Sequence, residues 1–224
     1  RQMCIRDRIE ADWCIGELYK TLENEGILDN TLIIFSSDNG PVLNDGYYDD
    51  AVEKLGDHTP SGGLRGGKYS LFEAGTKVPF ISYWRGKINP GVSNELISQV
   101  DLLNSISSII GSEFKSNDGI DLSDLLLRNK GKGRDHLVVE ASTRTAFRKG
   151  DWVIIPPYDA PALNKNVNIE LGNSKNFQLY NLEDDPSQKN NLAKIEKEKL
   201  KEIYNEFLKI RGDDFSNIES LKLE

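Results

Sequence analysis

Apolar side chains recur at helical spacing in three segments of the chain. The first segment begins at Ile9 and is closed by Gly26, a residue type that often ends a helix. The second ends at Gly111, and either Leu96 or Asp101 starts it, since aspartate is a favoured helix N-cap. The third begins near residue 191. The apolar positions that carry these patterns are Ala11, Ile15, Leu18 and Leu22, then Leu96, Val100, Leu103, Ile106 and Ile110, then Leu192, Ile195, Leu200, Ile203, Tyr204 and Phe207.

Short apolar runs rich in β-branched residues predict strands between these helices. Residues 31–35 form one continuous run, which is typical of a strand in a parallel sheet covered on both faces. A second strand is expected at 78–84. Later in the chain, four short runs predict a small antiparallel sheet, with a hairpin turn at 149–151. These runs are 137–139, 145–147, 152–155 and 177–180.

Together these elements predict an α/β fold in two parts. Residues 9–111 are expected to form the C-terminal part of a large mixed central sheet flanked by helices. Residues 112–210 are expected to form a small subdomain, an antiparallel sheet with a helix on it. Residues 1–8 lack an apolar period and are interpreted as a frayed or artefactual start, and 211–224 as a tail.

Net charge, the length of the apolar runs and the cysteine spacing each exclude or disfavour a class of function. The chain of 224 residues carries a net charge of −8, which disfavours a nucleic-acid partner. No apolar run approaches the roughly 18 residues that cross a bilayer. Cys4 and Cys14 have no zinc-binding spacing and are expected to be free thiols. Because the chain opens without Met or a signal-peptide pattern, we expect that its true N-terminus lies upstream, and the compartment is left open.

Two motifs carry candidate chemistry. Asp38 and Asn39, in Ser37-Asp38-Asn39-Gly40, follow the strand at 31–35 and offer the hard oxygens that Ca²⁺ prefers. Read alone, this segment is more often a plain turn. Lys68 follows paired glycines in a long loop, where an ammonium can meet an oxyanion. The loop lacks the spacing of a phosphate-binding P-loop, and a flexible surface loop is the alternative.

The segments together resemble the sulfatase family of the alkaline phosphatase-like superfamily. The matching segments, in family order, are SDNGP at 37–41, LRGGK at 64–68, FEAGTKVP at 72–79, and QLYNL, DP and NLA at 178–182, 185–186 and 191–193. The resemblance implies that Asp38 and Asn39 are calcium ligands and that Lys68 contacts the sulfate. It also implies a formylglycine nucleophile made from Cys or Ser. The substrate would be a sulfated small molecule or glycan, and a periplasmic or extracellular location is common in the family.

The chain departs from the family at the nucleophile. The family motif, C/S-x-P/A-x-R, lies far upstream of SDNG. The run from Cys4 to Arg8 has Arg6 where Pro or Ala belongs, so we do not assign Cys4 as the nucleophile. Two side chains cannot fill a calcium shell of about 6–8 oxygens. The chain is therefore expected to be a C-terminal fragment that binds calcium weakly and does not turn over substrate alone.

Other candidates and rival functions stay open at this point. His58, in the same long loop, is a candidate contact to the sulfate or the sugar. Glu73 is expected to accept hydrogen bonds that shape the loop, and Trp13 to lie in the core. The rival enzyme is a phosphatase or phosphodiesterase of the same superfamily, which would use paired zinc. The rival of another class is a non-catalytic binding module, and the oligomeric state is not indicated.

Overall fold

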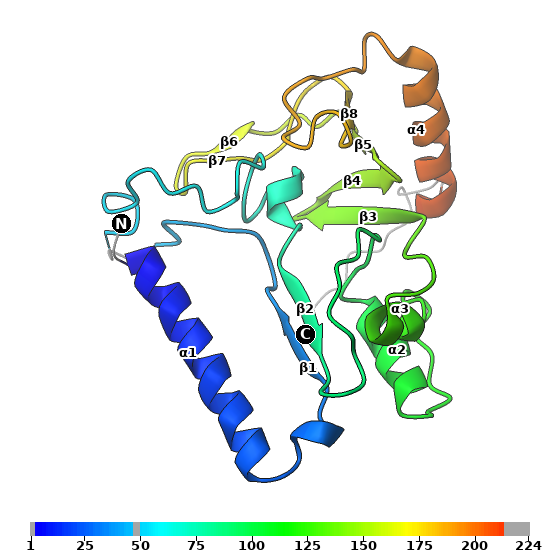
Figure 1. Cartoon of the computed structure of the whole chain (residues 1–224). Helices are drawn as coiled ribbons and strands as arrows, with labels where there is room; N and C mark the ends of the chain where they lie inside the picture. The colour runs from blue at the N-terminus through cyan, green and yellow to red at the C-terminus, as the bar shows by residue number, and fades with distance from the viewer. Residues whose placement is uncertain (1–2, 47–49, 213–224) are drawn as a thin grey trace, which may run out of the picture.

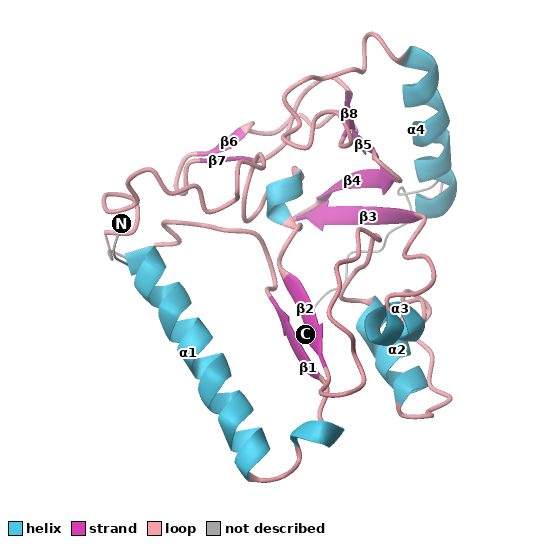
Figure 2. Cartoon of the chain, viewed as in Figure 1, coloured by secondary structure: helices cyan, strands magenta, loops and turns pink. Residues whose placement is uncertain are grey.

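The computed structural model describes residues 3–46 and 50–212, with side chains from residue 8 onward (Figure 1). Two groups of elements share the molecule: a long helix with a two-stranded ladder, and a four-stranded sheet with a helix on it (Figure 2). The helices are α1 (Met3–Asn24), α2 (Asp101–Ile109), α3 (Ser123–Arg128) and α4 (Lys197–Arg211). The strands are β1 (Ile33–Ser36), β2 (Phe80–Tyr83), β3 (His136–Ala141), β4 (Arg144–Lys149), β5 (Trp152–Ile155), β6 (Leu163–Asn164), β7 (Ile169–Glu170) and β8 (Gln178–Asn181). Short 3₁₀ turns lie at Leu28–Asn30 and Glu73–Gly75.

The four-stranded sheet confirms the predicted antiparallel sheet and helix. Its strand order is β3-β4-β5-β8, and all neighbours are antiparallel. Successive residues point to opposite faces, so each strand supplies two cores. Phe147, Ile154 and Leu179 pack with Ile203 and Phe207 of α4. On the opposite face, the sheet packs against two residues of the long loop that also holds Lys68.

These two loop residues are Leu71 and Phe72, and both are buried. They pack against Ala146, Ile155 and Tyr180 on the face of the sheet that α4 does not cover. Burying an apolar side chain of this size contributes about 1.5–3 kcal/mol. The segment that follows Lys68 is therefore part of the core of the four-stranded sheet, although the two lie far apart in sequence.

The strand at 31–35 forms as β1, but its predicted partner geometry is wrong. β1 pairs with β2 in an antiparallel ladder, with Phe35 opposite Ile81. Ile81 is 58% exposed, so one face of this ladder is open rather than covered. A continuous apolar run predicts that both faces of a strand are buried. It does not predict which strand lies beside it, or whether the two are parallel or antiparallel.

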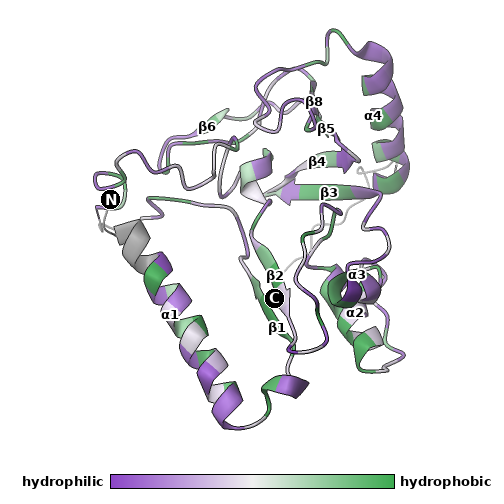
Figure 3. Ribbon diagram, in the orientation of Figure 1, coloured by the Kyte–Doolittle hydropathy of each residue, from purple (hydrophilic) through white to green (hydrophobic). Residues whose placement is uncertain are grey.

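Helix α2 turns the face opposite to the predicted one toward the protein. The expected apolar stripe is exposed, with Ile110, just past its last turn, at 72%, whereas Asp101, Asn104 and Ser105 are buried. Figure 3 shows the green hydrophobic side of α2 and the green strands β1 and β2. Periodicity revealed that the helix has an apolar face, but not what covers that face.

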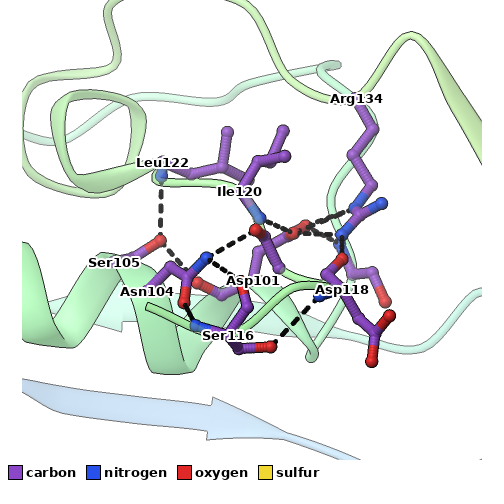
Figure 4. A network of polar contacts seen from close by, with 10 residues as sticks. Asp101, Asn104, Ser105, Ser116, Asp118, Ile120, Leu122 and Arg134 are labelled. Carbon is purple, nitrogen blue, oxygen red and sulfur yellow. Dashed lines mark hydrogen bonds and ion pairs between the residues drawn. The ribbon is translucent and has the colours of Figure 1, made fainter. Parts of the chain in front are cut away.

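One network of hydrogen bonds satisfies the buried Asp101, Asn104 and Ser105 of α2 (Figure 4). Arg134 donates from Nε and Nη2 to the Asp101 carboxylate, at 2.8 and 2.5 Å. The same carboxylate accepts from the backbone N–H of Ser98 and Ile120. Helix α2 starts at Asp101 and not at Leu96, and Val100 is its N-cap. These bonds offset the cost of burying the charge.

The remaining differences are at boundaries and in short elements. α1 begins at Met3 rather than Ile9, and α4 begins at Lys197 rather than near residue 191. α3 and the hairpin of β6 and β7 were not predicted, because each is too short to show a period. Trp13, expected in the core, is 63% exposed. In the described part of the chain, no helix is long and apolar enough to cross a membrane.

Candidate active site

The SDNG segment forms a turn directly after β1. The carboxylate of Asp38 is exposed and has no hydrogen-bond or ion-pair partner within residues 3–46 and 50–212. Asn39 donates its side-chain N–H to the carbonyl of Gly40, at 2.8 Å, and its Oδ1 has no hydrogen-bond partner among the residues that the structure describes. The turn is also held from outside, since Gln99 donates to the carbonyl of Ser37. Two oxygen donors are thus presented on a fixed turn.

Backbone packing ties this turn to the loop that holds Lys68. Gly40 donates to the carbonyl of Gly75 at 2.8 Å, and Lys68 donates its backbone N–H to the carbonyl of Pro41 at 3.0 Å. A Cβ on Gly40 would lie 1.6 Å from the carbonyl oxygen of Ala74. Only glycine allows this approach. The candidate metal ligands and the candidate catalytic lysine therefore belong to one packed unit.

The Lys68 side chain is held by a carboxylate that sequence reasoning did not single out. Its Nζ donates to Asp45 at 2.6 Å, and the hydroxyl of Tyr69 donates to the other oxygen of Asp45 at 2.7 Å. The hydrogen bond from Lys68, and then that from Tyr69, lowers the pKa of Asp45 below its usual value. The hydrogen bond to Asp45 likewise raises the pKa of Lys68, so the ammonium stays charged. An ammonium has three donors, and this contact uses one.

Arg65 fastens the lysine loop to the C-terminal half of the chain. Its guanidinium donates from Nε and Nη2 to both carboxylate oxygens of Glu170, at 2.7 and 3.1 Å. It also donates to the carbonyl of Gln188 at 2.8 Å and lies 4.0 Å from the ring centre of Phe72. Glu170 belongs to β7, so Arg65 sets the distance between the lysine loop and the β6–β7 hairpin.

Glu73 anchors the other end of the same loop. Its backbone N–H donates to Oε1 of the buried Gln188 at 2.7 Å. Its carboxylate lies 3.4 Å from the guanidinium of Arg148 and 4.0 Å from Nζ of Lys77. The expected role of Glu73 as an acceptor that shapes the loop is confirmed. With Arg65, it pins both sides of the segment in which Lys68 lies.

Comparison with known proteins decides the family. Residues 9–112 match the family model described as Sulfatase. Over 199 residues, 87% of this chain, the sequence is 43% identical to the N-acetylgalactosamine-6-O-sulfatase of Bacteroides thetaiotaomicron. The chain belongs to the sulfatase family. Arylsulfatase A of Homo sapiens is 36% identical over 121 residues, which cover 53% of this chain and 22% of that protein.

Solved structures of sulfatases share the fold. One comes from the glycosaminoglycan-metabolism locus of Bacteroides thetaiotaomicron, with a TM-score of 0.85 and 40% identity over 90% of this chain. Another is the PsFucS1 sulfatase of a Pseudoalteromonas species, with a TM-score of 0.68 and 29% identity over 91% of this chain. The chain spans about two fifths of these relatives, 39% of the Bacteroides enzyme and 43% and 41% of the two solved chains.

The donor set fits part of a hard-cation site in this sulfatase chain. Asp38 and Asn39 supply oxygens, the ligand type that suits Ca²⁺. Within the residues that the structure describes, no group of three or more His, Cys, Asp or Glu side chains could hold a metal. Asp38 and Asn39 thus fit two positions of a shell, and the remaining positions would need ligands from elsewhere.

His58 and Cys14 make no described contact with this unit. Nε2 of His58 accepts a hydrogen bond from Arg8 of α1 at 2.6 Å. No contact in the described part of the chain joins His58 to Asp38 or Lys68, and its role in the site stays a prediction. Cys14 is an exposed free thiol, as expected. The side chain of Cys4 lies outside the described residues.

The contacts that sequence reasoning missed are those between distant segments. Asp45 and Tyr69 hold the lysine, yet Asp45 lies 23 positions before Lys68 in a loop without periodicity. Glu170 lies 105 positions after Arg65. The only local sign of these contacts in the sequence is the presence of Asp45 and Tyr69 themselves. Both residue types are common in loops, so neither stands out.

Proposed function

We propose that the protein to which this chain belongs hydrolyses sulfate esters of a glycan, with Asp38 and Asn39 among its calcium ligands and Lys68 on the sulfate. The observation that carries the proposal is the packed unit of the two motifs. The turn with two free oxygens and the loop with the charged lysine share backbone hydrogen bonds, at Gly40 and at Lys68. A metal cation and an ammonium on one unit could both contact the same sulfate group and neutralise its negative charge.

In this reaction the S–O ester bond breaks, the sulfur gains an oxygen from water, and the released alcohol takes a proton. Lys68 would donate hydrogen bonds to sulfate oxygens and stabilise the charge that builds up on them. Calcium would supply further charge neutralisation. The family resemblance places the nucleophile, a formylglycine, outside the residues assigned here. The names of the relatives favour an amino-sugar sulfate as substrate class, since the Bacteroides relative is an N-acetylgalactosamine-6-O-sulfatase.

The test is a fusion, here called the sulfatase fusion. In it, residues 9–212 of this chain replace the matching part of the Bacteroides thetaiotaomicron enzyme. The fusion is expressed in a host that converts the nucleophile precursor in the remaining part of that enzyme to formylglycine. We expect hydrolysis of N-acetylgalactosamine 6-sulfate, and loss of that activity in Lys68→Ala with the fold intact. Preferential hydrolysis of the matching phosphate ester would favour the phosphatase alternative. A correctly folded fusion with neither activity would contradict the proposal.

A further inference from the structure

An open depression of about 430 Å³ is lined in part by Asp45, the hydrogen-bond partner of Lys68, and by Tyr69. It is bounded on one side by the loop that follows SDNG and on the other by the β6–β7 hairpin. The side chains of Asp45, Tyr69, Asn164, Asn166 and Val167 line it. Asp45 accepts the hydrogen bond from Nζ of Lys68, so one wall of the depression is in contact with the ammonium.

The depression has walls fixed by contacts that reach across the sequence. Arg65 binds Glu170, and the hydroxyl of Ser70 donates to the carbonyl of Glu170 at 2.6 Å. Leu71 donates its N–H to the carbonyl of Leu171 at 3.1 Å. A Cβ on Gly67 would lie 3.1 Å from Cδ1 of Ile169, so the hairpin is pressed against the glycines that precede Lys68. The hairpin therefore has a set position relative to the lysine.

The polar groups of the lining point to a polyhydroxyl ligand. Oδ1 of Asn164 accepts from the N–H of Asn166 at 3.1 Å, which leaves its NH₂ group for other acceptors. The side chain of Asn166 has no partner among the residues that the structure describes. Side-chain amides offer donor and acceptor together, which matches neighbouring hydroxyls of a sugar. Val167 and the ring of Tyr69 add apolar surface of the kind that packs against C–H faces.

Tyr69 is held in a conformation that bulky residues rarely adopt. Its φ is 74°, in the left-handed region. The hydrogen bond from its hydroxyl to Asp45 keeps the ring at the edge of the depression. Backbone strain of this kind concentrates at ligand-binding positions, where the surrounding contacts maintain it.

We propose that this depression binds the sugar ring of the sulfate ester, with Asn164 and Asn166 bonding its hydroxyls while Lys68 takes the sulfate. The inference rests on the proposed function. It makes the β6–β7 hairpin the element that selects a sugar over an aryl or other apolar alcohol, since an apolar group would leave these amides without partners.

The experiment is an NMR titration of the 224-residue chain, uniformly labelled with ¹⁵N. The ligands are N-acetylgalactosamine 6-sulfate, N-acetylgalactosamine and inorganic sulfate. We expect both sugars to shift the amide signals of Asn164 and Asn166 as well as that of Tyr69. Inorganic sulfate should shift Lys68 and its neighbour Tyr69 but neither asparagine of the hairpin. Asn166→Ala should weaken sugar binding by about fivefold, the loss of one or two hydrogen bonds. Its response to inorganic sulfate should not change.

The matched control is Asn205→Ala, which removes an exposed asparagine from α4 and should leave every titration unchanged. Unshifted signals elsewhere in the Asn166→Ala spectrum show that the variant is folded. Sugars that fail to shift the hairpin signals, or that bind Asn166→Ala as well as the parent, overturn the inference. Turnover by the sulfatase fusion is measured separately, so a fusion that hydrolyses the sulfate while the hairpin stays silent refutes the subsite alone.

Discussion

Arg65 and Glu170 bind each other through two parallel hydrogen bonds, at 2.7 and 3.1 Å, across 105 positions of sequence. The pair joins the loop of the candidate catalytic lysine to the β6–β7 hairpin. Because a planar guanidinium matches a carboxylate with two bonds, this contact fixes orientation as well as distance. The hydrogen bond from Arg65 lowers the pKa of Glu170 below its usual value.

Replacing Arg65 by alanine should destabilise the protein by about 2–3 kcal/mol, the value of hydrogen bonds to a charged group that is partly buried. Arg65→Lys should recover less than half of the loss, since an ammonium cannot form the paired contact. Urea unfolding measures both. The control is Arg128→Ala, which breaks an exposed pair with Asp124 and should cost less than about 0.5 kcal/mol. Equal losses for the two arginines would show that the pair does not anchor the loop.

Gly40→Ala should separate the SDNG turn from the lysine loop. The new Cβ would meet the Ala74 carbonyl at 1.6 Å, so one backbone must move, at a cost of about 1–3 kcal/mol or more. Gly16→Ala is the matched control, because nothing lies within 4 Å of its Cβ and it sits within α1. That change should stabilise the helix by about 0.5–1 kcal/mol. Thermal unfolding of both variants checks the difference in sign, and two changes of the same sign would argue against the close approach.

The pKa of Asp45 reports on the position of Lys68. Its folded value should lie below the model-peptide value of about 3.9, because Lys68 and then Tyr69 bond the charged form. A lowered folded pKa contributes stability above the unfolded value and loses it as the pH falls through the folded value. The measurement is a carbon-13 NMR titration of the Asp45 carboxyl group. Lys68→Gln should raise the pKa of Asp45 more than Tyr69→Phe does, and no change in Lys68→Gln would rule out the contact in solution.

The exposed apolar faces of the β1–β2 ladder and of α2 are expected to pack against another part of the full protein. Ile81 of β2 is 58% exposed, and Phe35, its partner in the ladder, is 38% exposed. Ile110, just beyond α2, is 72% exposed. Exposed apolar residues that lie next to each other mark interaction surfaces. We expect this chain alone to bind a hydrophobic fluorescent dye strongly and the sulfatase fusion to bind it weakly. Ile81→Ser should lower dye binding of the chain alone. Strong dye binding by an active fusion would mean that the faces stay open.

The sequence predicted the elements better than the surfaces between them. Periodicity located α4, whose Ile203 and Phe207 are buried against the sheet. It also located α1, although Leu18 of the α1 stripe is 52% exposed. The short apolar runs located the strands of the antiparallel sheet. Periodicity misplaced the face of α2, since the spacing of Leu103 and Ile106 is the same whether that stripe is buried or open. The motifs identified Asp38 and Lys68 as candidates. Asp45, Glu170 and the short β6–β7 hairpin were missed, because contacts between distant loops leave no local pattern. The division at residue 112 stays a prediction.

The proposed function requires that Asp38 and Asn39 hold calcium beside Lys68. Calorimetric titration of calcium into the metal-free sulfatase fusion measures this binding. We predict that Asp38→Ala and Asn39→Ala each weaken calcium binding by at least about tenfold, because each removes one oxygen ligand. Asp159→Ala, an exposed aspartate paired with Lys175, should leave the affinity unchanged. Unchanged calcium affinity in Asp38→Ala and Asn39→Ala, with the fusion folded, would contradict the account.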